Sequence, residues 1–203
     1  MDPDACTGWR KLQMIKAFVA SFERQFWRFP FVGSLYSKPY RRIVANEISL
    51  AGIGFRDTVL NVGCGSIPFT AIYTALQTGA QVYAVDCDRR AVEFAKAYIR
   101  RHHKNLRINV VHGNGTDRLG INFDVAVVAL QAGPKGKILE MLSQSSSQKA
   151  RFVFREPSSE YSSQYDPMPS SLEPDGSIYQ GMPTFRRSLL FLNSSISQRS
   201  SAV

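Results

Sequence analysis

The chain has 203 residues, 44% of them apolar and 11% aromatic, which suffices for one substantial core and excludes two full-sized domains. No 18 apolar residues run together, so no membrane-spanning helix is expected. The net charge of +9 attracts anions, whether nucleic acid, an acidic membrane surface or a small molecule, and charge alone does not choose among them. The odd number of cysteines, three, and the absence of a signal-peptide pattern favour a reducing, cytoplasmic setting.

The first expected element is an amphipathic helix over residues 9–27. Its apolar residues recur at steps of three and four, which is the pattern of one apolar helical stripe. Basic residues cover its other faces, so the helix suits either a globular core or a membrane surface, and we favour the core.

A second helix is expected to follow a break. Pro30 and Gly33 interrupt the first helical pattern, and Ser37 followed by Pro39 predicts the cap and first turn of a new helix that ends near Ala51.

From Thr58 onward, short apolar runs alternate with helical stretches, the βα rhythm of a parallel sheet. We expect strands at 58–62, 81–85, 106–111, 123–130 and 150–154, helices at 68–78, 89–101 and 135–143, a loop at 157–177, and hairpin strands at 177–180 and 188–192. The fold class is therefore α/β: a Rossmann-like, doubly wound, mostly parallel sheet with two N-terminal helices and a C-terminal β-hairpin. The expected divisions are a helical extension at 1–55, the Rossmann-like domain at 56–195 and a disordered tail at 196–203.

The stretch VLNVGCGSIPFT forms the first strand and a glycine loop. Gly63, Cys64 and Gly65 follow the strand directly, and the two glycines let the backbone turn sharply and approach a ligand. Ser66 and Pro68 then begin a helix whose free N–H groups point back at the same space. Pro68 stands where a dinucleotide-binding loop has its third glycine, and no Gly-Lys-Ser/Thr follows for a P-loop. The loop therefore favours a ligand smaller than a dinucleotide, or a zwitterionic one.

Polar residues follow the next two strands at the same edge of the sheet. Asp86 ends the second strand, 23 positions after Gly63, where a carboxylate accepts both hydroxyls of a ribose. Its alternative role is to cap the next helix, for which Asp88 is better placed. Asn114 stands between two glycines after the third strand, where it either meets an adenine edge or forms a turn.

GCGSIPFT, the acid of VDCD and the GNG turn, at this spacing, resemble the class I S-adenosylmethionine-dependent methyltransferases over roughly residues 56–156. In that family the glycine loop cradles the methionine part, the acid holds the ribose and the residue after the third strand faces adenine. By position, the resemblance implies S-adenosylmethionine contacts from Gly63, Cys64, Gly65, Ser66, Asp86, Cys87 and Asn114. Two positions depart from the family pattern: Asn61 stands where many members have an acid, and Asn114 replaces the usual Asp.

A narrower resemblance is to the nicotianamine synthase-like branch of the same superfamily, whose members transfer the aminocarboxypropyl arm of S-adenosylmethionine. It rests on G-x-G-x-x-P-F-T, on ALQAGPK after the fourth strand and on FREP at the end of the fifth. No catalytic residue is carried over by position. Glu47 is expected to be a boundary residue with its carboxylate in water, a place in a cleft being the alternative, and Lys135 and Arg155 are candidate contacts for a substrate carboxylate.

The reaction needs little acid–base machinery, because a sulfonium is already an activated donor and positioning supplies most of the rate. LQAGPK stands where enzymes that methylate adenine or glutamine amines carry Asn/Asp-Pro-Pro-aromatic, which disfavours nucleic-acid and protein acceptors without excluding nucleic acid.

His102 and His103 are adjacent, so they do not bind one metal from one helical face, and no metal is expected. Nothing indicates the oligomeric state.

The sequence thus predicts an S-adenosylmethionine-dependent methyltransferase that acts on a small molecule, for which the basic charge favours an anionic acceptor. The alternatives are aminocarboxypropyl transfer and a non-catalytic nucleoside-binding protein of the same fold. Two local basic clusters occur, one at Arg41 and Arg42 and one through Arg100, Arg101, Lys104 and Arg107. Each is either a solvated surface, which we favour, or an anion-binding face.

Overall fold

The computed structural model of the chain describes residues 30–200, so the helix expected over 9–27 lies outside the described residues. The chain divides into two compact units between Tyr40 and Arg41, and the account below concerns the second. Helix α2, Pro30–Ala51, crosses that division and begins earlier than predicted. Proline fits the first turn of a helix because its missing N–H has no intrahelical partner there, so Pro30 opens the helix instead of breaking it.

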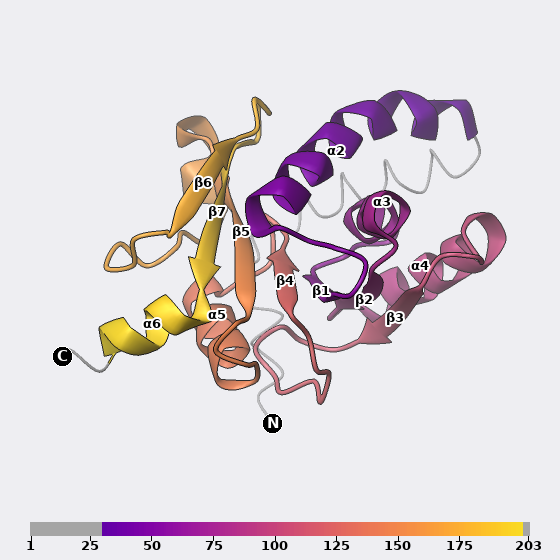
Figure 1. The fold of residues 1–203 in the computed structure, drawn as a ribbon. Helices are drawn as coiled ribbons and strands as arrows, with labels where there is room; N and C mark the ends of the chain where they lie inside the picture. Colours follow the sequence, from indigo (N-terminus) through magenta and orange to yellow (C-terminus); the bar gives the residue numbers. More distant parts are fainter. Residues whose placement is uncertain (1–29, 201–203) are drawn as a thin grey trace. The chain divides into compact units, whose positions relative to one another are not determined.

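The centre of the fold is a seven-stranded sheet in the order β3-β2-β1-β4-β5-β7-β6 (Figure 1). The strands are β1 Thr58–Val62, β2 Gln81–Asp86, β3 Ile108–His112, β4 Val125–Val128, β5 Arg151–Pro157, β6 Gly176–Tyr179 and β7 Phe185–Leu192. Strands β1 to β5 pair in parallel, whereas β7 runs antiparallel between β5 and β6. The predicted Rossmann-like fold is confirmed, and the predicted hairpin strands extend its sheet.

The helices of this unit are α3 Phe69–Thr78, α4 Arg89–His102, α5 Lys135–Gln144 and α6 Asn193–Ser200, with a short 3-10 helix, η2, at Ser159–Gln164. Helix α4 begins as predicted, because the Asp88 carboxylate accepts the backbone N–H of Arg90 at 2.9 Å. Residues 196–203 were expected to form a disordered tail, and this expectation is wrong for residues 196–200. Helix α6 includes residues 196–200, and Ile196 packs on the core.

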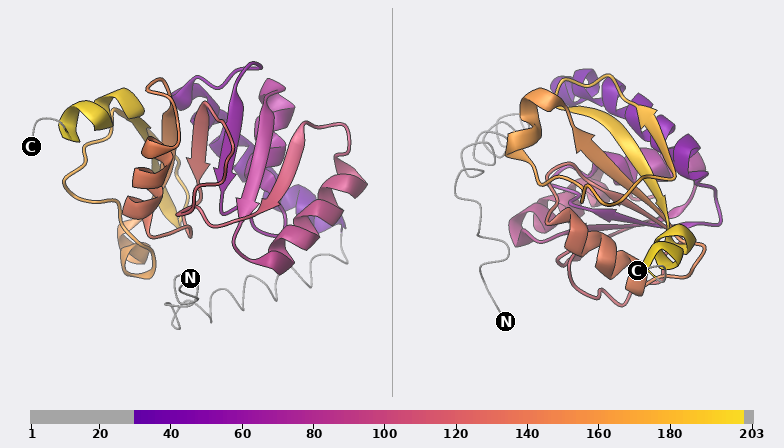
Figure 2. Two further views of the ribbon diagram at one scale, coloured as in Figure 1. Left: turned by 90° about the horizontal axis from the view of Figure 1, so that it is seen from below. Right: turned by 90° about the vertical axis from the view of Figure 1, so that its left-hand side faces the viewer.

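Helices lie on both faces of the sheet (Figure 2). On one face, Ile138 and Leu142 of α5 pack on β4 and β5. On the other, Ala71 and Ala75 of α3 pack beside Ala51 at the end of α2. Because β1 to β5 are parallel, their carboxyl ends meet at one edge, where the residues predicted to hold the cofactor lie.

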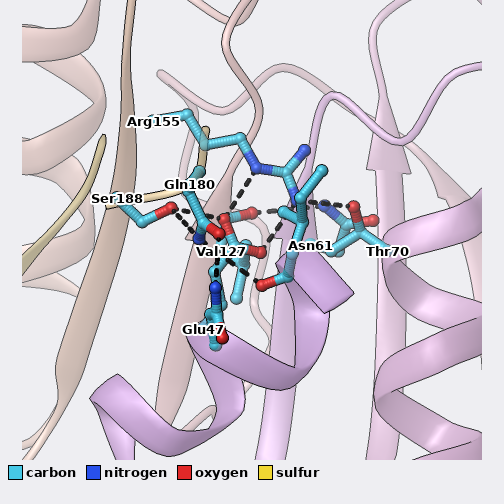
Figure 3. Close-up of polar contacts among 9 residues, drawn as sticks. Glu47, Asn61, Thr70, Val127, Arg155, Gln180 and Ser188 are labelled. Carbon is cyan, nitrogen blue, oxygen red and sulfur yellow. Dashed lines mark hydrogen bonds and ion pairs between the residues drawn. The ribbon is translucent and has the colours of Figure 1, made fainter. Parts of the chain in front are cut away.

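A buried ion pair joins α2 to the sheet on the α3 side (Figure 3). The Arg155 guanidinium donates from Nε and Nη2 to the two oxygens of Glu47, both at 2.8 Å, and Ser188 Oγ donates to Glu47 Oε1 at 2.8 Å. Arg155 Nη2 also donates to Thr70 Oγ1, at 2.9 Å. The side chains of Glu47 and Arg155 are only 1% and 4% exposed. One polar cluster therefore connects α2, α3, β5 and β7.

The expectation that the Glu47 carboxylate points into water is wrong. Nothing in the residues around Glu47 indicates its partner, a cation 108 positions later in the sequence. A buried carboxylate is tolerated where a cation and hydrogen-bond donors satisfy it, and Arg155 and Ser188 do so here.

Replacing Glu47 with alanine leaves the Arg155 charge buried without its partner, so we expect Glu47→Ala to lose about 3–5 kcal/mol of unfolding free energy in urea titrations. The matched control is Arg187→Ala, which breaks the Arg187–Glu156 pair, whose side chains are 46% and 32% exposed. An exposed pair contributes at most about 1 kcal/mol. Equal losses in the two variants would contradict the assignment.

Candidate functional site

The glycine loop after β1 is fixed to the end of β2. The backbone N–H groups of Gly63 and Cys64 both donate to the carbonyl of Val85, at 2.8 and 3.0 Å. Gly63 and Gly65 have φ values of +77° and +67°, in the left-handed region that favours glycine. The predicted sharp turn is confirmed, and it brings the loop beside Asp86.

The two glycines have different surroundings. A β-carbon at Gly63 would lie 3.1 Å from that of Ala129 and 3.2 Å from that of Ala132, so this glycine lets the loop after β4 pack closely. A β-carbon at Gly65 would have no heavy atom within 4 Å. Gly65 therefore borders open space at the carboxyl edge of the sheet.

The Asp86 carboxylate connects the first two loops of this edge. Its Oδ2 accepts the N–H of Gly65 at 2.8 Å, and its Oδ1 accepts the N–H of Asp88 at 3.0 Å. Because an ionised carboxylate offers about four acceptor sites, each oxygen can still accept a further hydrogen bond. Asp86 is half-buried and held in one orientation, which fits the recognition of a pair of ribose hydroxyls.

The two cysteines of the predicted site differ in environment. Cys64 is buried, and burial together with the nearby Asp86 carboxylate raises the pKa of its thiol above the ordinary value. The Cys64 thiol is therefore neutral at physiological pH and is not a nucleophile. Cys87 is exposed, and its backbone carbonyl lies 3.1 Å from His112 Nε2. Ser66 is half-buried in the glycine loop.

Asn114 forms a turn, which is one of the two roles that the sequence allowed. Its Oδ1 accepts the N–H of Thr116 at 3.2 Å. The flanking glycines are needed for packing, because a β-carbon at Gly113 would lie 2.6 Å from a methyl of Leu119 and one at Gly115 would lie 2.5 Å from a methyl of Val62. A contact of Asn114 with adenine stays a prediction.

Lys135 at the start of α5 is buried, and its side chain is bonded within the protein. Its Nζ donates to the carbonyls of Leu130 and Asp166, at 2.9 and 2.6 Å, and its backbone N–H donates to the Asp166 carboxylate. Burial lowers the pKa of the Lys135 amine to about 8, and the Asp166 carboxylate opposes this shift. Through these hydrogen bonds, Lys135 holds the segment between β5 and β6 against the loop after β4.

The expected roles of Lys135 and Arg155 as substrate-carboxylate contacts are therefore wrong. Lys135 is 1% exposed and Arg155 is 4% exposed, and each donates its hydrogen bonds to groups of the protein. Sequence reasoning also missed Asp166, which lies in the segment expected to be a loop. No local signal identifies it, because its partner is 31 positions away.

Other features of the described residues lie apart from this edge. A hollow of about 260 Å³ is lined by the β3–β4 connection and the end of α5, and it contains none of the predicted cofactor residues. Within the described chain no cluster of His, Cys, Asp and Glu is arranged to hold a metal ion. Among the same residues, no helix combines the length and the apolar character needed to cross a bilayer.

Comparisons with known proteins agree with this fold. Residues 52–155, just over half of the chain, match the family model described as Ribosomal protein L11 methyltransferase (PrmA). A search of curated protein sequences gave no significant match.

Three solved structures show the same fold. MtNAS in complex with MTA and tNA is 22% identical, with a TM-score of 0.69 over 79% of this chain and 62% of that one, so the chain spans less than two thirds of it. A Glu-to-Gln variant of MtNAS in complex with S-adenosylmethionine is 21% identical, with a TM-score of 0.67 over 90% and 72%. An RNA methyltransferase from Salinibacter ruber in complex with S-adenosyl-L-homocysteine is 15% identical, with a TM-score of 0.59 over 74% and 90%.

At these identities the solved structures establish the fold, and the match to the family model identifies the family. The mostly parallel sheet, the two positive-φ glycines and the acid at the end of β2 are those expected from the resemblance to class I enzymes. The chain belongs to the PrmA family of class I S-adenosylmethionine-dependent methyltransferases, and its cofactor is S-adenosylmethionine.

Proposed function

We propose that this chain transfers a methyl group from S-adenosylmethionine to a small molecule at the carboxyl edge of β1, β2 and β4. The observation that carries the proposal is the pairing of Gly65, which borders open space, with the fixed carboxylate of Asp86. A zwitterionic ligand with a ribose fits these two neighbours. The cytoplasmic setting stays a prediction.

The proposed cofactor contacts are the residues inferred from the sequence: Gly63, Cys64, Gly65, Ser66, Asp86, Cys87 and Asn114. In this arrangement the Asp86 carboxylate accepts the ribose hydroxyls, and the glycine loop lies against the methionine part. The chemistry that the cofactor supplies is an activated methyl group. The protein then has to orient an acceptor, and no proton-transfer residue needs to be assigned.

The acceptor is proposed to approach over the loop after β4. The Lys135–Asp166 contacts hold the β5–β6 segment against that loop, which supports a confined acceptor site. Since Lys135 and Arg155 are bonded internally, the carboxylate of an anionic acceptor would need other partners. The family description names a ribosomal protein, and the LQAGPK sequence after β4 favours a small acceptor over it.

Aminocarboxypropyl transfer is the second candidate. It is favoured by the likeness to MtNAS, which extends over 79–90% of this chain and so beyond the stretch matched by the family model. MtNAS has been crystallised with S-adenosylmethionine and with MTA and tNA. Both reactions use the same sulfonium, so the glycine loop and Asp86 serve either one.

Removal of the Asp86 carboxylate should weaken cofactor binding. We expect Asp86→Ala to lose about 2–3 kcal/mol of binding free energy for S-adenosylhomocysteine in calorimetry, the magnitude of charge-assisted hydrogen bonds. The control is Asp88→Ala, which removes the cap of α4 and should cost about 1 kcal/mol of stability with little change in affinity. Unchanged binding by Asp86→Ala would show that Asp86 serves only its neighbouring loops.

Gly65→Ala tests the open space beside the glycine loop. Gly120 is a matched control, because it also has a positive φ, +66°, and a β-carbon there would also have no atom within 4 Å. Each alanine should cost about 1–2 kcal/mol of stability through the left-handed backbone. Only Gly65→Ala should weaken binding of S-adenosylhomocysteine, by about tenfold or more. Equal affinities of the two variants would remove Gly65 from the site.

The by-product distinguishes the two reactions. With S-adenosylmethionine and a metabolite extract, methyl transfer leaves S-adenosylhomocysteine, whereas aminocarboxypropyl transfer leaves methylthioadenosine. We expect S-adenosylhomocysteine by chromatography, above the rates without enzyme and with Asp86→Ala. Methylthioadenosine alone would establish the second candidate, and neither product, with intact cofactor binding, would indicate a non-catalytic protein.

A further inference from the structure

The positive charge of the described unit is concentrated in one segment. Residues 89–107 contain seven Lys and Arg residues and a single acid, Glu93, whereas the rest of residues 41–200 contain twelve of each sign. The seven cations define the α4 basic face: Arg89, Arg90, Lys96, Arg100, Arg101, Lys104 and Arg107. All seven are exposed. The remainder of the unit is therefore neutral, and this face alone gives it a net charge.

The helix arranges these cations in rows. Arg89, Lys96 and Arg100 are separated by seven and four residues, which places them along one line of the helix surface. Arg90 and Arg101 form a neighbouring line. At a rise of about 1.5 Å per residue, each line is about 16 Å long. The apolar side of α4, with its buried Ala91, Val92, Ala95 and Ile99, packs away from the rows, and the helix contacts the edge strand β3 and its neighbour β2.

The cations of the rows form no ion pair with another described residue. Among the described residues the ion pairs are Arg151–Asp57, Arg155–Glu47 and Arg187–Glu156, none of which involves the α4 basic face. Arg107 lies 5.6 Å from the centre of the Phe55 ring and donates to the carbonyl of Gly79 at 3.5 Å. Like charges placed together repel one another, and a bound polyanion would relieve this repulsion.

Exposed aromatic rings border the cations. Phe94, on the outer side of α4, is 48% exposed, and Phe55, under the Arg107 guanidinium, is 66% exposed. Phe94 lies four positions after Arg90 and seven before Arg101, so it belongs to their row. Cations that follow a phosphate backbone, interleaved with rings on which bases stack, are the features of proteins that bind single-stranded nucleic acid.

The composition of the face also bears on other polyanions. Five of the seven cations are arginine, whose planar guanidinium binds phosphate with two hydrogen bonds. A membrane-surface helix turns a broad apolar side toward the lipid, but the apolar side of α4 packs within the protein. A sugar–phosphate backbone that carries unpaired bases therefore matches this face better than a lipid surface does.

We propose that the α4 basic face binds single-stranded RNA, with phosphates along the Arg89–Lys96–Arg100 row and a base on Phe94. This partner is separate from the methyl acceptor, and its binding requires neither cofactor nor turnover. A failure of the proposed enzymatic function therefore leaves the proposal intact, and the reverse also holds.

The test uses the full chain and a fluorescently labelled 20-nucleotide RNA of mixed sequence, followed by anisotropy at several salt concentrations. The variant Arg89→Gln, Lys96→Gln, Arg100→Gln should bind at least tenfold more weakly and reduce the slope of log K against log salt by about 2, since each phosphate contact contributes about 0.7. The control Arg118→Gln, Lys137→Gln, Lys149→Gln removes the same charge at exposed positions outside the face and should change binding less than threefold. Equal losses in the two triple variants would overturn the proposal.

A second pair of variants tests base stacking. Phe94→Ala should weaken RNA binding about tenfold, within the range for loss of one stacked base, whereas Leu76→Ala, at an exposed leucine of α3, should not change it. Polyphosphate of equal charge should bind more weakly than RNA and be insensitive to Phe94→Ala. Three outcomes would replace RNA with another partner: equal binding of polyphosphate with no effect of Phe94→Ala, preference for phosphatidylserine vesicles, or preference for poly-glutamate.

Discussion

The buried ion pair between Glu47 and Arg155 is the constraint on which the arrangement of the carboxyl edge of the sheet depends. Its energy comes from two charges that pair with each other, with further hydrogen bonds from Ser188 to Glu47 and from Arg155 to Thr70. Burial of either charge alone would be strongly unfavourable, so the pair fixes which segments can lie together. Because Thr70 belongs to the first turn of α3, the contact also orients the helix that follows the glycine loop.

Two kinds of contact hold the loops at the carboxyl edge of the sheet. The glycine loop after β1 is held mainly through its backbone, by the carbonyl of Val85 and the carboxylate of Asp86. On the side of the loop after β4, the support is the buried Lys135 amine and Asp166. The buried charges at 47, 135 and 155 are thus structural. An already activated cofactor suits such an edge, because the reaction depends chiefly on orientation.

The paired charges and the excess positive charge of the unit lie in different places. The buried charges of Glu47 and Arg155 are paired with each other, whereas the excess cations lie along α4 and the turn that follows it. Asp86 ends β2 and helix α4 begins at Arg89, so only the turn of Cys87 and Asp88 separates the proposed cofactor contact from the α4 basic face. The two can therefore serve different ligands on one rigid βα unit.

The sequence by itself determined the elements whose signals are local. Apolar runs bounded by polar residues gave β1 with its observed bounds, Asp88 was recognised as the cap of α4, and the glycine spacing indicated the turn at Gly63 and Gly65. The same local patterns identified the family. Tertiary structure alone decided the pairing of Glu47 with Arg155 and of Lys135 with Asp166, because in each pair the two residues come from distant segments whose positions depend on the order of the strands. A helical pattern shows which side of a helix is buried, but whether a charge on that side is exposed, paired or bound to substrate depends on what packs against it.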